Sequence, residues 1–198
     1  MSGTPSPLLS VEALSLNRGL RMLFRDLGFT VARGDLLLLR GANGTGKSSL
    51  LRVLAGFLPP GAGTVTWAPG IPRPRYLGHQ DGLKRPMTVR ENLRFLEALY
   101  GIDTSRNVES LGIRPLMNLA VGDLSAGQRR RVALARMVTG DGAPWLMDEP
   151  ATSLDDAGKT WLWERIAEHR ARGGTVIAAV HDPEEPADAR VLTLGGPA

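Results

Sequence analysis

The sequence predicts an α/β fold: a mainly parallel core sheet, an antiparallel β layer near the N-terminus and an inserted α-helical subdomain. Apolar runs at 35–40, 144–147 and 175–180 are too short for helices and suit buried parallel strands. Two of these runs end in a glycine-rich or an acidic turn. After residue 80 the pattern changes to helical periodicity, with a capping box at Thr88-Val-Arg-Glu91.

The 198 residues suit one domain built around one main core. We expect about residues 1–80 and 136–198 to form this core with its β layer. About residues 81–135 would form the helical subdomain. The β layer is expected from three short strands at residues 8–16, 24–31 and 64–67.

A glycine-rich loop between a buried strand and a helix gives the strongest chemical signal. Residues 41–48, Gly-Ala-Asn-Gly-Thr-Gly-Lys-Ser, match the pattern G-x-x-x-x-G-K-[ST] without a mismatch. Glycines let several backbone amides point at one anion, and the following helix adds the positive end of its dipole. Lys47 would reach the β- and γ-phosphates, and the Ser48 hydroxyl would bind Mg²⁺. The expected nucleotide-binding residues are Gly41, Asn43, Gly44, Gly46, Lys47, Ser48 and Ser49.

Two adjacent carboxylates follow another of the short apolar runs. Asp148-Glu149-Pro150 comes directly after the run 144–147. The carboxyl ends of parallel strands line the ligand crevice of such sheets. We therefore expect Asp148 to hold magnesium and Glu149 to orient or deprotonate the attacking water. A solvated acidic turn is the alternative, and the match at Lys47 disfavours it.

A second helix start could also bind an anion. In Leu124-Ser-Ala-Gly-Gln128, Ser125 is a good N-cap and Gln128 completes a capping box. Helical periodicity follows, so free N–H groups and the positive dipole end would project from this start. An ordinary capped helix is the alternative. Because the sequence also predicts a triphosphate site, we prefer the interpretation that this helix start binds a phosphate.

This segment, with the Arg129–Arg136 run behind it, resembles the signature motif of ATP-binding cassette (ABC) proteins, which are P-loop NTPases. Other motifs follow in the family's order: Gln80 matches its Q-loop, residues 153–155 its D-loop and His181 its switch histidine. The resemblance implies that ATP and Mg²⁺ bind between two copies of the chain. Its implied catalytic residues are Lys47, Gln80, Glu149 and His181. Its implied magnesium ligands are Ser48, Gln80 and Asp148. The residues that it implies act on the nucleotide of the opposite copy are Ser125, Gly127 and Gln128.

The base-binding region departs from the family pattern. Many cassettes stack an aromatic side chain on adenine, but residues 15–20 contain none. Arg18 could stack through its planar guanidinium group instead. The Asn-Lys-x-Asp motif of guanine-specific GTPases is missing from the sequence, which favours ATP.

The amino-acid composition excludes several classes of function. The net charge is +4 without a long basic stretch, and we expect the densest cluster, Arg129–Arg131, to be a solvated helix face. His169 is likewise expected to be solvated. The sequence has no cysteine, which excludes disulfides and thiolate metal sites. Because no apolar run approaches about 20 residues, we expect the chain to need other subunits to form a transport path.

The whole chain most resembles the ATP-binding subunits of haem exporters in cytochrome c maturation, through residues 18–24, 78–84, 91–95 and 124–136. This resemblance implies integral membrane partners and a peripheral place on the cytoplasmic face of a bacterial inner membrane. Two alternatives remain open. The chain could energise a different exporter, or be a non-transport cassette acting on nucleic acid or ribosomes. The weak charge and the lack of a tandem cassette or coiled-coil insert disfavour the second alternative, so we expect no nucleic-acid partner.

Overall fold

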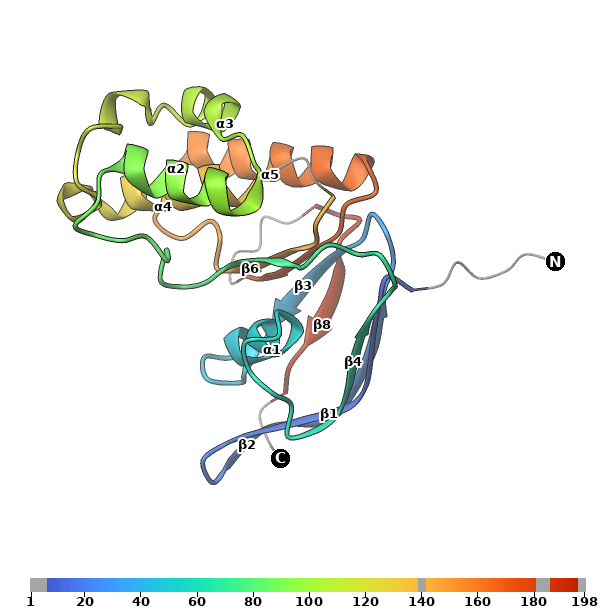
Figure 1. The fold of residues 1–198 in the computed structure, drawn as a ribbon. Coiled ribbons are helices and arrows are strands. Elements are labelled where there is room, and N and C mark those ends of the chain that lie inside the picture. Colours follow the sequence, from blue (N-terminus) through green and yellow to red (C-terminus); the bar gives the residue numbers. More distant parts are fainter. Residues whose placement is uncertain (1–6, 139–141, 181–185, 196–198) are drawn as a thin grey trace.

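The computed structural model describes residues 7–138, 142–180 and 186–195, which form two sheets and the helices packed on them (Figure 1). An antiparallel sheet has the strand order β2-β1-β4, and a parallel sheet has the order β5-β6-β7-β3-β8. The antiparallel strands are β1 (Leu9–Arg18), β2 (Arg21–Val31) and β4 (Ala62–Trp67). The parallel strands are β3 (Leu36–Arg40), β5 (Arg75–Leu77), β6 (Trp145–Asp148), β7 (Val176–Ala179) and β8 (Arg190–Thr193). The predicted α/β fold with its antiparallel layer is therefore confirmed.

The central strands of the parallel sheet are buried on both faces. Successive residues of a strand point to opposite faces, and in β3 both sets are apolar. Leu36 and Leu38 belong to one core cluster, whereas Leu37 and Leu39 belong to the other. β6 and β7 divide their side chains between the two clusters in the same way. The two-sided burial explains why these strands are continuous apolar runs in the sequence.

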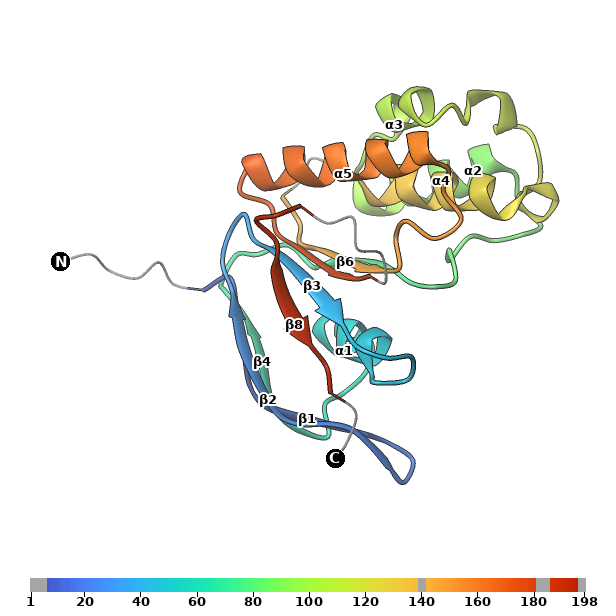
Figure 2. The same cartoon turned by 180° about the vertical axis from the view of Figure 1, so that it is seen from behind.

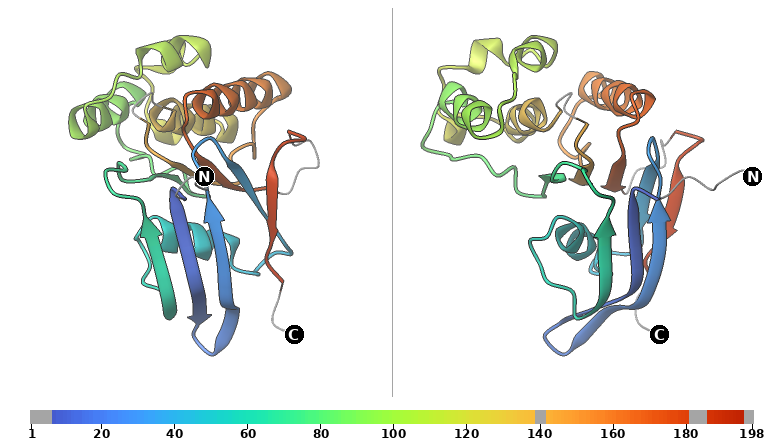
Figure 3. Two further views of the ribbon diagram at one scale, coloured as in Figure 1. Left: turned by 90° about the vertical axis from the view of Figure 1, so that its right-hand side faces the viewer. Right: turned by 45° about the vertical axis from the view of Figure 1, so that its right-hand side comes forward.

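The helices cover the two faces unequally. α1 (Lys47–Leu54) lies on the same face as the antiparallel layer, as Figure 3 shows. The opposite face carries the remaining helices, visible from two sides in Figures 1 and 2. These are α2 (Val89–Tyr100), α3 (Ser105–Ser110), α4 (Ala126–Met137) and α5 (Asp156–Ala171), with 3₁₀ turns η1 (Arg114–Leu116) and η2 (Val121–Asp123).

Both predicted capping boxes are confirmed. The Thr88 hydroxyl accepts a hydrogen bond from the Glu91 amide at 3.2 Å, and the Glu91 carboxylate accepts one from the Thr88 amide at 2.8 Å. α2 then ends at Gly101, whose φ of 63° lies in the left-handed region. Ser125 and Gln128 form the same reciprocal pair at the start of α4. Local sequence therefore determines where these two helices begin.

Two expectations about surface residues are wrong. His169 is buried on α5, and its ring stacks on Trp145 with centroids 3.8 Å apart. Arg130 is also buried, although its neighbours Arg129 and Arg131 are partly exposed. Both side chains are covered by segments distant in the chain. The short strand β5 was not expected either, because Pro72 and Pro74 make its surroundings resemble a loop.

Candidate functional site

The glycine loop after β3 is shaped to hold an anion. Gly41, Gly44 and Gly46 have φ values of 140°, 80° and 103°. A Cβ on Gly41 would collide with the carbonyl oxygen of Leu194, the residue that follows β8. α1 begins at Lys47 with Gly46 as its N-cap and no capping side chain, so a bound anion can meet the first amides of the helix.

The expected nucleotide-binding residues lie on this loop and the first turn of α1. Asn43 and Gly44 are exposed, and Ser48 and Ser49 are partly buried. The Lys47 ammonium donates hydrogen bonds to the carbonyl oxygens of Gly41 at 2.7 Å and Ala42 at 3.2 Å. Its charge is thus held within the loop, where a phosphate would lie.

The acidic turn stands at the end of β6, and α1 packs against this strand. Asp148 is 2% exposed, and its buried Oδ2 accepts no hydrogen bond from the part of the chain that the structure describes. A buried carboxylate oxygen without a donor is costly. It suits a cation, and carboxylate and hydroxyl oxygens are hard donors of the kind Mg²⁺ prefers. Asp148 and Ser48 therefore fit a magnesium site chemically.

Glu149 follows in an unusual backbone conformation. Its φ is 50°, in the left-handed region that non-glycine residues seldom adopt. Its amide donates to the carbonyl oxygen of Ala179 at 3.0 Å. Its carboxylate accepts a hydrogen bond from the Thr152 hydroxyl at 3.3 Å and lies 3.9 Å from Nδ1 of His79. The carboxylate is partly exposed, as contact with a water molecule requires.

Gln80 lies in a cleft beside the start of α4. The cleft has a volume of about 650 Å³ and is lined by residues of the Q-loop, of α4 and of the segment after the acidic turn. Gln80 itself is exposed. Its assignment to the magnesium shell remains a prediction. His181 follows β7 but lies outside the described residues, so its assignment also remains a prediction.

The start of α4 is open to solvent. Ser125 and Ala126 are exposed, and the capping box uses the amides of Ser125 and Gln128. Gly127 packs closely on the segment that follows the acidic turn: a Cβ on Gly127 would lie 2.8 Å from the carbonyl oxygen of Ser153. In Figures 1 and 2 this helix start lies well apart from the glycine loop, toward the same side of the molecule. The two elements that are expected to bind phosphate are therefore separated within one chain.

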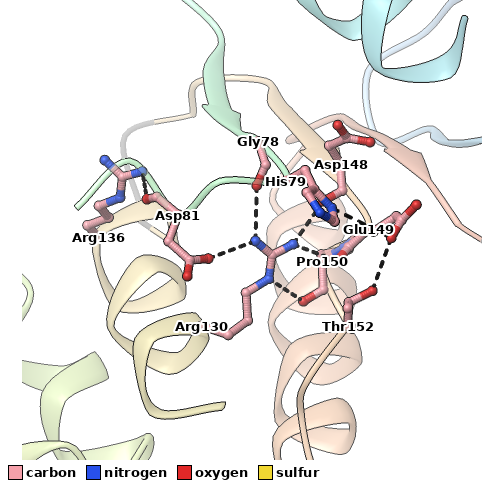
Figure 4. Close-up of polar contacts among 9 residues, drawn as sticks. All are labelled: Gly78, His79, Asp81, Arg130, Arg136, Asp148, Glu149, Pro150 and Thr152. Atoms are coloured by element: carbon pink, nitrogen blue, oxygen red, sulfur yellow. Dashed lines mark hydrogen bonds and ion pairs between the residues drawn. The ribbon is translucent and has the colours of Figure 1, made fainter. Parts of the chain in front are cut away.

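Arg130 joins the Q-loop to the acidic turn, as Figure 4 shows. Its guanidinium group donates to backbone carbonyls on both sides and to the Asp81 carboxylate. Arg136, further along α4, donates to the Asp81 carbonyl oxygen. Burial lowers the pKa of Arg136, and the Asp81 charge opposes this shift. Motif spacing alone gave no sign of these contacts.

Arg21 lies nearer to the glycine loop than the expected Arg18 does. The two face each other across the β1–β2 hairpin, and both are exposed. A Cβ on Gly44 would stand 3.6 Å from Nη1 of Arg21, whereas no atom of Arg18 comes that near. The only sign of this contact in the sequence is the pair of arginines, Arg18 and Arg21, that flank the hairpin turn.

Comparisons with known proteins agree with this geometry. The ABC transporter family matches residues 24–152. The chain belongs to this family. It is thus an ATP-binding, ATP-hydrolysing subunit, of a kind that generally dimerises and pairs with membrane subunits. Among the residues that the structure describes, no helix has the length and apolarity needed to cross a bilayer.

Relatives cover nearly the whole chain. The cytochrome c biogenesis ATP-binding export protein CcmA of Rhizobium meliloti is 40% identical, over 95% of this chain and 98% of the relative. CcmA of Rhodopseudomonas palustris is 41% identical, over 96% and 99%. An ABC transporter ATP-binding protein from Pyrococcus furiosus has a TM-score of 0.77 at 24% identity, covering 94% of this chain and 96% of that one. An ATP-binding cassette in its ADP conformation gives 0.68 at 23% identity, covering 90% and 83%. These two structures support the fold.

We predict that Arg21, and not Arg18, contributes to nucleotide binding. Arg21→Ala should weaken ATP binding about tenfold, the equivalent of ~1.4 kcal/mol for one charge-assisted contact. Arg18→Ala is the matched control and should bind like the unaltered protein. Titration with a fluorescent ATP analogue measures both. A loss confined to Arg18→Ala would restore Arg18 as the contact.

Proposed function

We propose that the chain is the ATP-hydrolysing subunit of an exporter that moves haem for cytochrome c biogenesis. The observation that supports this most is the 40–41% identity to CcmA export proteins over nearly the full length of both chains. Haem is the group that cytochromes c bind covalently, so an export step in their biogenesis has an obvious cargo. We also propose a single domain, with a helical subdomain over about residues 81–135 inserted in the core.

The first step of the proposed mechanism is capture of ATP by the glycine loop. The amides that begin α1 surround the phosphates, and Lys47 exchanges its carbonyl partners for β- and γ-phosphate oxygens. Asp148, Ser48 and Gln80 would hold Mg²⁺, which neutralises developing charge on the phosphates when it is bound. The buried Oδ2 of Asp148, which has no hydrogen-bond donor among the described residues, supports this ligand set.

Glu149 then aligns water for in-line attack on the γ-phosphate. Its carboxylate stands at the carboxyl end of β6, and its orientation is limited by Thr152. His181 is proposed to contact the γ-phosphate and to hold the attacking geometry. Catalysis of this kind consists mainly of positioning and of stabilising charge.

A second copy of the chain completes each site. The separation of the start of α4 from the glycine loop supports this proposal. Ser125, Gly127 and Gln128 would then act on the γ-phosphate bound by the other copy. ATP would then join two copies at two composite sites. Hydrolysis removes the phosphate that links them, so the dimer opens. Because the two copies would associate more tightly with ATP bound than after its hydrolysis, the cycle can drive movement in attached subunits.

Integral membrane subunits are the proposed partners, which would hold the chain at the cytoplasmic face of the inner membrane. A groove of about 850 Å³ between the end of α1 and α2 supports a docking role. Phe57 and Tyr100 are exposed there, and Arg75 lies over the Tyr100 ring at 5.3 Å. This aromatic and basic lining suits an acidic, amphipathic cytoplasmic segment of a membrane subunit.

We predict that Glu149→Gln separates binding from turnover. The variant should bind ATP normally and form a stable dimer, because the γ-phosphate that joins the copies persists. Its kcat should fall about 10²- to 10⁴-fold, the usual contribution of a general base. Glu168→Gln, which alters an ion pair with Arg165 on α5, is the control and should retain kcat. Retained turnover in Glu149→Gln would refute the role of Glu149.

Deleting the gene from its native host tests the proposed cargo. The deletion should abolish covalent haem attachment to c-type cytochromes, measured by haem staining of separated proteins, and the intact gene should restore it. Glu149→Gln should not restore it. Normal cytochrome maturation, with co-purification of unrelated membrane subunits, would favour a different exporter. Salt-sensitive binding to nucleic acid without membrane partners would favour a non-transport function.

A further inference from the structure

Arg130 binds three successive carbonyl oxygens of the acidic turn. Nη2 donates to the carbonyl oxygens of Asp148 at 2.8 Å and Glu149 at 2.5 Å, and Nε donates to that of Pro150 at 3.2 Å. The residue is only 4% exposed. A planar guanidinium group has five N–H donors, one for each of the acceptors around Arg130, whereas a lysine ammonium group has only three.

The other side of the same guanidinium group binds the Q-loop segment. Nη1 donates to the carbonyl oxygen of Gly78 at 3.0 Å and to the Asp81 carboxylate at 3.0 Å. These two residues flank Gln80 in the sequence. One buried side chain of α4 therefore holds both the Q-loop and the turn that bears the proposed catalytic carboxylate (Figure 4).

The backbone of Glu149 needs such support. A non-glycine residue with φ of 50° is strained, and strain of this kind persists only where surrounding contacts hold it. The Glu149 amide is bound to Ala179 on β7, and its carbonyl oxygen is bound to Arg130. The two bonds fix the peptide units on both sides of its Cα, and thereby the direction in which the carboxylate leaves the chain.

We propose that Arg130 is a positioning residue for ATP hydrolysis, which holds Glu149 in its reactive orientation and joins that orientation to α4 and the Q-loop. This inference rests on the proposed role of Glu149. Because α4 begins at the exposed Ser125 cap, any shift of the helix on binding the opposite copy must move the three carbonyl groups or break their bonds. Closure of the dimer and alignment of the attacking water are then one event.

The test is a set of kinetic measurements on the full chain. Arg130→Met should lower kcat about 10²-fold, the loss expected when a catalytic group is misplaced by ~1 Å. Its affinity for ATP should stay within about threefold, because none of the contacts of Arg130 involves the glycine loop. Arg170→Met is the matched control. Arg170 also joins a carbonyl oxygen, that of Gly34, to a carboxylate, that of Asp188, and its loss should leave kcat unchanged.

Arg130→Lys keeps the result interpretable if Arg130→Met folds poorly. A lysine retains the charge that faces Asp81, but its three donors leave one nitrogen atom and cannot span the five acceptors that the planar guanidinium group of Arg130 serves. Its kcat should also fall at least tenfold with ATP affinity retained. Wild-type kcat in Arg130→Lys would overturn the inference, because a charge alone would then suffice.

A double-mutant cycle with Glu149→Gln distinguishes positioning from general damage. If Arg130 acts through Glu149, replacing Arg130 in a Glu149→Gln background should cause little further loss of kcat. An equal further loss would overturn the inference while leaving the role of Glu149 intact. Failure of the proposed function would give a different result. Either the unaltered chain would show no ATP turnover, or Glu149→Gln alone would retain full turnover.

Discussion

The proposed site between two copies depends on the separation, within one chain, of two helix starts that can bind phosphate. α1 begins at the glycine loop without a capping side chain, and α4 begins at the exposed Ser125 cap. Each offers backbone amides and a positive dipole end to an anion, yet the two do not surround a common space in one copy. A triphosphate that uses both must therefore lie between two copies.

Burial of the central strands positions the remaining groups. β7 lies between β3 and β6, so the glycine loop and the acidic turn emerge at the carboxyl edge of one sheet, separated by one strand. The apolar residues that pack both faces of these strands restrict movement of that edge. The Oδ2 atom of Asp148 is buried and receives no hydrogen bond from the described residues, so the proposed cation would offset the cost of burying it and would link core packing to the chemistry of the site.

Local signals made much of this predictable from sequence. The glycine loop, both capping boxes and the short buried strands each depend on residues a few positions apart, so their patterns survive in one sequence. The burial of Arg130 and His169 is not visible in local sequence, because distant segments cover them: Arg130 contacts Gly78 across 52 positions, and His169 contacts Trp145 on another element. The proximity of Arg21 to Gly44 cannot be predicted locally either, because it depends on how the hairpin folds over the loop. Periodicity cannot report contacts of this kind.

The most direct test of the composite site is to mix two variants, each of which lacks a different half of the site. Both carry Glu149→Gln, so that ATP should hold the dimer closed. Lys47→Ala removes the phosphate lysine, and Ser125→Glu places a negative charge at the start of α4. Neither variant alone should dimerise with ATP in analytical ultracentrifugation. Their mixture should form dimers with ATP, because one of the two sites then combines an intact glycine loop with an intact Ser125 from the other copy. A mixture that stays monomeric would contradict binding between copies.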